Sequence, residues 1–144
     1  MEPAALRFST DSGELDLDLV YTFLREETPW AKGLPRATFE RSIENSLCFG
    51  AYIGEAQIGF ARVVTDRATF AYLCDVFVLP AHRSRGYAKA LMKYVVECDA
   101  LQGLRRFMLV TSDAHHVYRP FGFDAPANPE RIMERHNPVV YAKA

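Results

Sequence analysis

The chain has 144 residues, of which 49% are hydrophobic and 24% charged, and its formal net charge is −1. This length suits one domain with a sizeable core, so we expect a single domain over residues 1–144. A protein that binds nucleic acid in general needs a basic face, and the small net charge argues against that class. No segment has the length of a membrane span or the order of a secretory leader, so we expect no membrane partner and a cytoplasmic protein.

The three cysteines, Cys48, Cys74 and Cys98, are odd in number and stand in apolar surroundings. We interpret them as reduced core thiols of a cytoplasmic protein rather than as a disulfide framework. A catalytic thiol is the alternative, although the position of Cys74 inside an apolar run favours packing. No group of His, Cys and Asp has the spacing of metal ligands, so we expect no metal.

The first half of the chain is predicted to form a strand, two helices and an antiparallel meander. The expected elements are a strand at 5–9, helices at 15–27 and 38–46, and strands at 47–53, 57–65 and 70–79. Helical spacing of apolar residues indicates the helices, and runs of strand-forming residues separated by short turns indicate the strands. The loop at 28–35 carries the only tryptophan, Trp30, and is interpreted either as a lid over a pocket or as a plug on the core.

The second half is predicted to continue with a helix, a strand, a short helix and one or two final strands. Ala88, Leu91, Met92 and Val95 recur at i, i+3, i+4 and i+7, which places them on one face of a helix. The remaining expected elements are a strand at 107–110, a helix at 114–119, and strands at 132–134 and 139–141. The resulting class is α/β (α+β), a mixed and mostly antiparallel sheet with one central parallel βαβ unit and helices on both faces.

A short basic loop joins the central strand to the helix that follows it. It reads Ala81-His82-Arg83-Ser84-Arg85-Gly86-Tyr87-Ala88. A strand that enters a helix through such a loop presents free backbone N–H groups and the positive helix end to an anion. Gly86 leaves room for a phosphate, and Arg83, Arg85 and Lys89 add positive charge. The alternative is a plain turn with solvated arginines.

The absence of two well-known sequence motifs narrows the ligand class. No glycine-rich run ends in Gly-Lys-Ser or Gly-Lys-Thr, so a nucleoside-triphosphate loop is not expected. No G-x-G-x-x-G pattern follows a strand, so a dinucleotide-binding fold is not expected.

The pattern Arg83-x-x-Gly86-x-Ala88, directly after a strand that ends in Val78-Leu79-Pro80, resembles a known signature. It is similar to the motif with which the GNAT superfamily of N-acetyltransferases grips the pyrophosphate of acetyl-coenzyme A. Small bacterial members resemble this chain in three further segments, Trp30-Ala31-Lys32-Gly33, Ser46-Leu47-Cys48-Phe49-Gly50 and Asp113-Ala114-His115. The resemblance covers nearly the whole chain. It implies cosubstrate contacts from the loop residues Arg83, Ser84, Arg85, Gly86, Tyr87 and Ala88.

The same resemblance implies a place for the pantetheine arm of acetyl-coenzyme A and for a general acid. The arm would pair with the backbone of Val76, Phe77 and Val78, where an N–H donor can stabilise charge on the thioester oxygen. The family pattern N-x-x-A-x-x-x-Y falls on residues 111–118, which makes Tyr118 the candidate acid for the departing thiolate. Thr111 replaces the usual asparagine, so the resemblance leaves one expected contact to the coenzyme arm unassigned. The alternative for Tyr118 is a structural role, in which its side chain packs in the core and fixes the position of the helix.

Asp75 is a carboxylate inside an otherwise apolar strand. A buried acid must be paired, protonated or functional. By alternation we expect Asp75 to share a face of the sheet with Leu73 and Phe77. It is a candidate base or acceptor anchor, and the alternative is an ion pair with Arg62 or His115.

His115 is the second candidate for the base, although a histidine at the start of a helix also suits capping or packing. The residues expected to contact the substrate are Trp30, Arg62 and His115.

These expectations combine into one function. The chain would be an acyltransferase that moves an acetyl group from acetyl-coenzyme A to an amine of a small molecule or peptide by direct attack. The alternative is a non-catalytic module that binds or senses acyl-coenzyme A on the same fold. A tyrosine at the position of Tyr118 favours catalysis. A homodimer is one possible assembly.

Overall fold

The computed structural model describes residues 5–142, and in this range five strands form one sheet in the order β1-β2-β3-β4-β5. The strands are β1 (Leu6–Ser9), β2 (Leu47–Ile53), β3 (Ala56–Thr65), β4 (Phe70–Val78) and β5 (Arg106–Leu109). The β4–β5 pair is parallel and the other pairs are antiparallel. The predicted mixed sheet with one parallel unit is therefore confirmed.

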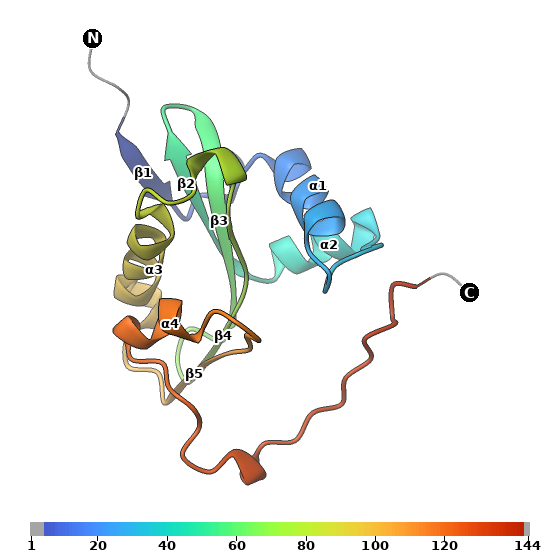
Figure 1. Cartoon of the computed structure of the whole chain (residues 1–144), viewed down its shortest axis with the longest axis vertical. Helices are drawn as coiled ribbons and strands as arrows, with labels where there is room; N and C mark the ends of the chain where they lie inside the picture. Colours follow the sequence, from blue (N-terminus) through green and yellow to red (C-terminus); the bar gives the residue numbers. More distant parts are fainter. Residues whose placement is uncertain (1–4, 143–144) are drawn as a thin grey trace.

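Helices cover both faces of this sheet (Figure 1). They are α1 (Leu17–Glu27), α2 (Arg36–Glu44), α3 (Tyr87–Glu97) and α4 (His115–Tyr118). The core cluster under α1 and α2 includes Phe23, Phe39 and Phe60, and the cluster under α3 includes Phe49 and Leu91. The sheet is thus the middle layer of three. Within residues 5–142 no helix is long and apolar enough to cross a membrane.

The two N-terminal helices begin at positions that their flanking residues determine. The Oδ1 atom of Asp16 accepts a hydrogen bond from the backbone N–H of Leu19 at 3.1 Å, so Asp16 is the N-cap of α1 and the helix starts two residues later than predicted. Helix α2 starts directly after Pro35 and ends at Glu44, two residues earlier at each end than predicted. Its buried residues are Phe39 and Ile43.

Strand β4 contains a bulge that corrects one prediction. Phe60 pairs with Phe77 and Arg62 pairs with Cys74, so two residues of β4 lie opposite one residue of β3. Asp75, in the bulge, has a φ of +53°. Leu73 accordingly packs under α3, whereas Phe77 packs under α1 and α2. The prediction that Asp75 shares one face with both residues is wrong, because the bulge changes the alternation.

The segment after α4 is a second correction. The strands predicted at 132–134 and 139–141 are wrong, because residues 124–142 form no strand. We call residues 124–142 the C-terminal arm; it runs away from β5 towards the loop between α1 and α2 (Figure 1). Every residue from 124 to 140 is exposed, and only Tyr141 packs against a core cluster. Strand-forming side chains do not form a ladder here, since the arm lies along no strand of its own chain.

Candidate active site

The two parallel strands at the centre of the sheet part from each other. Their pairing runs from Phe70 with Arg106 to Leu73 with Leu109 and goes no further. Strand β4 continues to Val78, while β5 ends at Leu109 and the next residue, Val110, is 77% exposed. The β5-facing edge of β4 from Asp75 to Val78 therefore has no strand partner among the described residues.

The basic loop lies at the end of this open edge. Gly86 precedes α3 with a φ of +78°, in the left-handed region that favours glycine, and no side chain caps the helix. A Cβ atom added at Gly86 would meet nothing within 4 Å, so the approach to the first turn of α3 is open. Ser84 also has a positive φ, of +64°. Uncapped N–H groups beside such a turn form a concave site for an anion.

Arg83 connects the loop to the end of β4. Its Nε atom donates a hydrogen bond to the carbonyl oxygen of Val78 at 2.9 Å. Arg83, Arg85 and Lys89 are all exposed, so the loop has positive charge that is accessible to solvent. Tyr87 packs against the small core cluster that contains Val78. The sequence-predicted loop residues and the open edge of β4 are therefore adjacent.

Tyr118 lies beyond the end of β5, on α4. It lines a groove of about 630 Å³ together with Leu109, Thr111 and His115. Burial raises the pKa of the Tyr118 phenol above its usual value, so the group stays protonated at neutral pH. His115 is exposed, and the hydroxyl of Thr111 accepts a hydrogen bond from the N–H of Ala114 at 3.0 Å. Tyr118 also packs against the core cluster under α3, which is the contact expected for the alternative, structural role.

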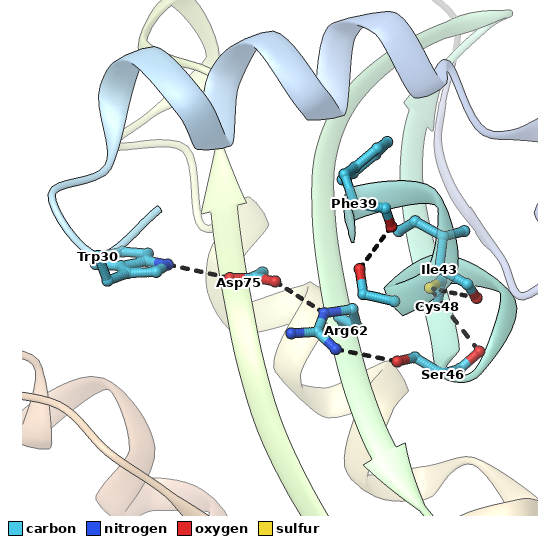
Figure 2. Close-up of polar contacts among 8 residues, drawn as sticks. Trp30, Phe39, Ile43, Ser46, Cys48, Arg62 and Asp75 are labelled. Atoms are coloured by element: carbon cyan, nitrogen blue, oxygen red, sulfur yellow. Dashed lines mark hydrogen bonds and ion pairs between the residues drawn. The ribbon is translucent and has the colours of Figure 1, made fainter. Parts of the chain in front are cut away.

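A network of polar contacts surrounds Asp75 on the face of the sheet that α1 and α2 cover (Figure 2). The Nε atom of Arg62 donates to Oδ2 of Asp75 at 2.8 Å, and the indole Nε1 of Trp30 donates to Oδ1 at 3.0 Å. A second guanidinium nitrogen of Arg62 donates to the hydroxyl of Ser46 at 3.1 Å. The side chains of Arg62 and Asp75 are only 19% and 11% exposed. Of the two partners predicted for Asp75, the structure shows Arg62 and not His115.

Charge and burial in this network decide which groups are ionised. Burial would lower the pKa of Arg62, but the carboxylate of Asp75 outweighs it and the pKa is raised. Burial raises the pKa of the Cys48 thiol to about 11 and that of Cys74 to about 12, although Arg62 opposes both shifts. Thiols with such pKa values are protonated at neutral pH and are poor nucleophiles. The catalytic-thiol alternative at Cys74 does not fit this environment.

The loop between α1 and α2 divides its residues between the core and the surface. Ala31 and Leu34 are buried in the cluster under α1 and α2, as a plug would be. Trp30 is 60% exposed and contacts Asp75 from outside. Ser46 was not predicted as part of the network, although the segment Ser46 to Gly50 carries part of the sequence resemblance. No group of three or more His, Cys, Asp or Glu between residues 5 and 142 could hold a metal ion.

Comparison with known proteins identifies the family. The model of the acetyltransferase (GNAT) family matches residues 17–123. The chain belongs to the GNAT family of acetyltransferases. The crystal structure of a protein belonging to this family from Xanthomonas campestris pv. campestris, an inferred acetyltransferase, is 51% identical, with a TM-score of 0.94 over 96% of this chain and 98% of that one.

Two further relatives extend this finding. An inferred acetyltransferase of Gibberella zeae is 33% identical over 132 residues, which cover 76% of this chain and 73% of the relative. The structure of a predicted acetyltransferase with acetyl-CoA from Clostridium acetobutylicum is 16% identical and shares the fold, with a TM-score of 0.65 over 92% of this chain and 96% of that one.

The Arg62–Asp75 pair gives a testable prediction for stability. We expect Arg62→Met to lower the free energy of unfolding by roughly 3–5 kcal/mol at neutral pH, because it leaves a nearly buried carboxylate without its counter-charge. Urea unfolding of the wild type and of Arg62→Met at neutral pH measures the difference.

Lys93→Met is the control for Arg62→Met. It breaks the exposed Lys93–Glu97 pair, whose side chains are 68% and 61% exposed. That change should cost between 0 and about 1 kcal/mol. Equal small losses in the two variants would show that the Arg62–Asp75 pair does not stabilise the fold.

Proposed function

We propose that this GNAT-family chain transfers an acetyl group from acetyl-coenzyme A to an amine of a small molecule or a peptide. The observation that carries the proposal is the open edge of β4, which has no strand partner beyond Leu73. The uncapped start of α3 follows one end of this edge. Tyr118 lines the groove beside the neighbouring strand, β5. An extended thioester with an anionic end suits an unpaired strand edge that ends at an anion-binding turn. The acetyl-CoA named with the Clostridium acetobutylicum relative supports the same cosubstrate.

The residues of the basic loop fit the pyrophosphate of the cosubstrate. The open space at Gly86 and the exposed guanidinium groups of Arg83 and Arg85 supply backbone donors and charge. The full set assigned to the cosubstrate is Val76, Phe77, Val78, Arg83, Ser84, Arg85, Gly86, Tyr87, Ala88 and Thr111. The cosubstrate supplies the activated acetyl group, and no metal is required for this chemistry.

The proposed reaction is a direct attack without a covalent enzyme intermediate. The amine nitrogen forms a bond to the thioester carbon, and the carbon–sulfur bond breaks. A backbone N–H of β4 stabilises the negative charge that develops on the carbonyl oxygen. Tyr118 donates its proton to the departing thiolate, a role that suits a phenol whose pKa is raised by burial. The proton of the ammonium passes to a base, and the protonated thiol leaves.

We assign the acceptor side of the site to the network around Asp75. Each carboxylate oxygen of Asp75 accepts one hydrogen bond, from Arg62 or from Trp30, and a carboxylate can accept about four. Asp75 can therefore hold a substrate ammonium and take its proton, while the exposed ring of Trp30 offers an aromatic face to a cation. His115, exposed in the groove beside Tyr118, is the second candidate for the base.

The competing function is a module that binds acyl-coenzyme A without catalysis. It would share the basic loop, but it would release no free thiol with any amine. A panel of amines scored by thiol release separates the two functions and identifies the acceptor. We also propose a cytoplasmic location, since Cys48, Cys74 and Cys98 are free thiols, as expected in a reducing compartment.

The basic loop yields the first prediction of this function. Coenzyme A should raise the melting temperature of the protein, and the double variant Arg83→Ala/Arg85→Ala should lose most of that shift, because it removes the charge beside Gly86. Thermal melting with and without coenzyme A measures it. The control is Arg25→Ala/Arg41→Ala, which removes two exposed arginines from α1 and α2. A full shift in Arg83→Ala/Arg85→Ala would mean that the anion site lies elsewhere.

The proposed general acid, Tyr118, yields the second prediction of this function. Tyr118→Phe removes only the hydroxyl, so kcat should fall about 100-fold while the Kd of coenzyme A stays almost constant. In the wild type, kcat should not fall in alkali until above about pH 10, the usual tyrosine pKa, because burial moves the pKa of Tyr118 upward. Thiol release and calorimetry measure kcat and Kd. Tyr94→Phe, in the core contact with Phe8, is the control. Equal losses of kcat and coenzyme affinity in Tyr118→Phe would make Tyr118 a packing residue.

Asp75 yields the third prediction of this function. Asp75→Asn keeps the shape and can still accept hydrogen bonds from Arg62 and Trp30, but it removes the charge. We expect kcat/KM to fall at least about 100-fold with a changed pH profile, while coenzyme binding and the fold survive. Asp113→Asn, at an exposed position before α4, is the control. A variant with reduced stability and full activity in its folded fraction would show that Asp75 is only a structural partner of Arg62.

A further inference from the structure

The guanidinium of Arg62 uses only part of its hydrogen-bonding capacity. Its Nε donates to Asp75 at 2.8 Å and one terminal nitrogen donates to the hydroxyl of Ser46 at 3.1 Å. The other terminal nitrogen, drawn in Figure 2 without a dashed line, has no partner in the described part of the chain. The buried side-chain polar atoms that lack a partner there are the hydroxyl of Tyr52 and Nδ1 of His82. The free nitrogen of Arg62 is therefore accessible to solvent.

Unused donors and unused acceptors lie next to each other in this network. The hydroxyl of Ser46 accepts the bond from Arg62 and, among the described residues, donates none. Each oxygen of Asp75 accepts one hydrogen bond and has a lone pair left. Arg62 and Ser46 thus offer donors to an anion, and Asp75 offers acceptors to a cation. Because Arg62 and Asp75 are in direct contact, one small molecule can reach both places.

The paired charges discriminate between classes of amine. For an acceptor that carries only an ammonium group, the positive charge of Arg62 opposes the attraction of Asp75. The two side chains are only 19% and 11% exposed, so water screens this repulsion in part. For an acceptor that carries both an ammonium group and a carboxylate, each charge meets one of opposite sign. A guanidinium also matches the planar geometry of a carboxylate, to which it donates charge-assisted hydrogen bonds.

We propose that the acceptor is a free α-amino acid, whose ammonium group binds Asp75 and whose carboxylate binds Arg62 and Ser46. This inference rests on the proposed acetyl transfer and specifies its substrate. Asp75 takes one proton from the ammonium and passes it to water, and the nitrogen bonds to the acetyl carbon as the carbon–sulfur bond breaks. Tyr118 protonates the thiolate and regains the second proton that the nitrogen loses. The products are an N-acetyl amino acid and coenzyme A.

The amino terminus of a peptide fits this site less well. Its ammonium group stands beside an amide instead of a carboxylate, so the free N–H groups of Arg62 would have no charged partner. The same holds for an amine that has lost its carboxylate.

Matched acceptors that differ only at the carboxylate test the inference. Thiol release is measured with acetyl-coenzyme A and the standard L-amino acids, their amides, and the amines left by decarboxylation. We expect kcat/KM to be about 10- to 100-fold lower for the amide and the amine, because both lack the charge-assisted bonds to Arg62. Calorimetry of the same compounds with the protein saturated with coenzyme A gives their Kd without turnover, and the amino acid should bind most tightly.

Two variants separate binding of the carboxylate from support of Asp75. Ser46→Ala removes one donor, and Arg62→Lys keeps the positive charge but loses the planar fork. Both should lower kcat/KM at least about 10-fold for the amino acid and leave that of the decarboxylated amine almost unchanged. Ser42→Ala removes a hydroxyl that donates to the carbonyl oxygen of Phe39 within α2, and it should change neither value. Circular dichroism and the melting shift with coenzyme A confirm that each variant is folded and binds the cosubstrate.

The outcomes distinguish this inference from the proposed function on which it rests. Equal kcat/KM for an amino acid and its decarboxylated amine would overturn the carboxylate site and leave acetyl transfer intact. Equal losses for both compounds in Ser46→Ala and Arg62→Lys would show that Arg62 only orients Asp75. Amino acids that neither bind nor release thiol would overturn the inference as well. Amino acids that bind through their carboxylate, without thiol release from any amine, would support the site and refute acetyl transfer.

Discussion

The extra residue in strand β4 decides which side of the sheet its neighbours face. Asp75 has a φ of +53°, a conformation that costs roughly 1–2 kcal/mol for most L-residues and less for aspartate. Leu73, before the bulge, packs under α3, and Phe77, after it, packs under α1 and α2. A regular strand would keep both on one face. The bulge therefore supplies each helical layer with its own apolar side chains and directs one carboxylate towards Arg62.

The ion pair that results is better explained by orientation than by stability. A buried pair gains little over well-packed apolar side chains of the same size, because both charges lose their hydration. What Arg62 and Trp30 provide is a fixed position for the carboxylate of Asp75, with one hydrogen bond to each oxygen. Ser46 holds the guanidinium of Arg62 in turn. The network thus joins strands β3 and β4 to the two segments that flank α2.

Local patterns in the sequence were sufficient for most of the fold. The order of strands, the parallel unit and the buried positions Leu91, Met92 and Val95 of α3 follow from periodicity and turns, which act between near neighbours in the chain. Ala88, predicted on the same face of α3, is exposed. The bulge at Asp75 could not be read this way, because it depends on the register between β3 and β4; the only sign was a carboxylate in an apolar run. Strand-forming residues at 132–134 and 139–141 were misleading, because sequence preference does not say which edge a strand will meet.

The candidate site, like the fold, has a part that local sequence patterns predicted and a part that they did not. The basic loop and Tyr118 were predicted from a motif and its spacing, and the structure places them beside the open edge of β4 and in the groove beyond β5. The contact between Trp30 and Asp75 spans 45 positions of the chain, and no local pattern could have indicated it. Trp30 is the only tryptophan in the sequence. Its indole is therefore the single tryptophan fluorophore of the protein and is hydrogen-bonded to Asp75, so tryptophan emission would report on a change at that carboxylate without any added label.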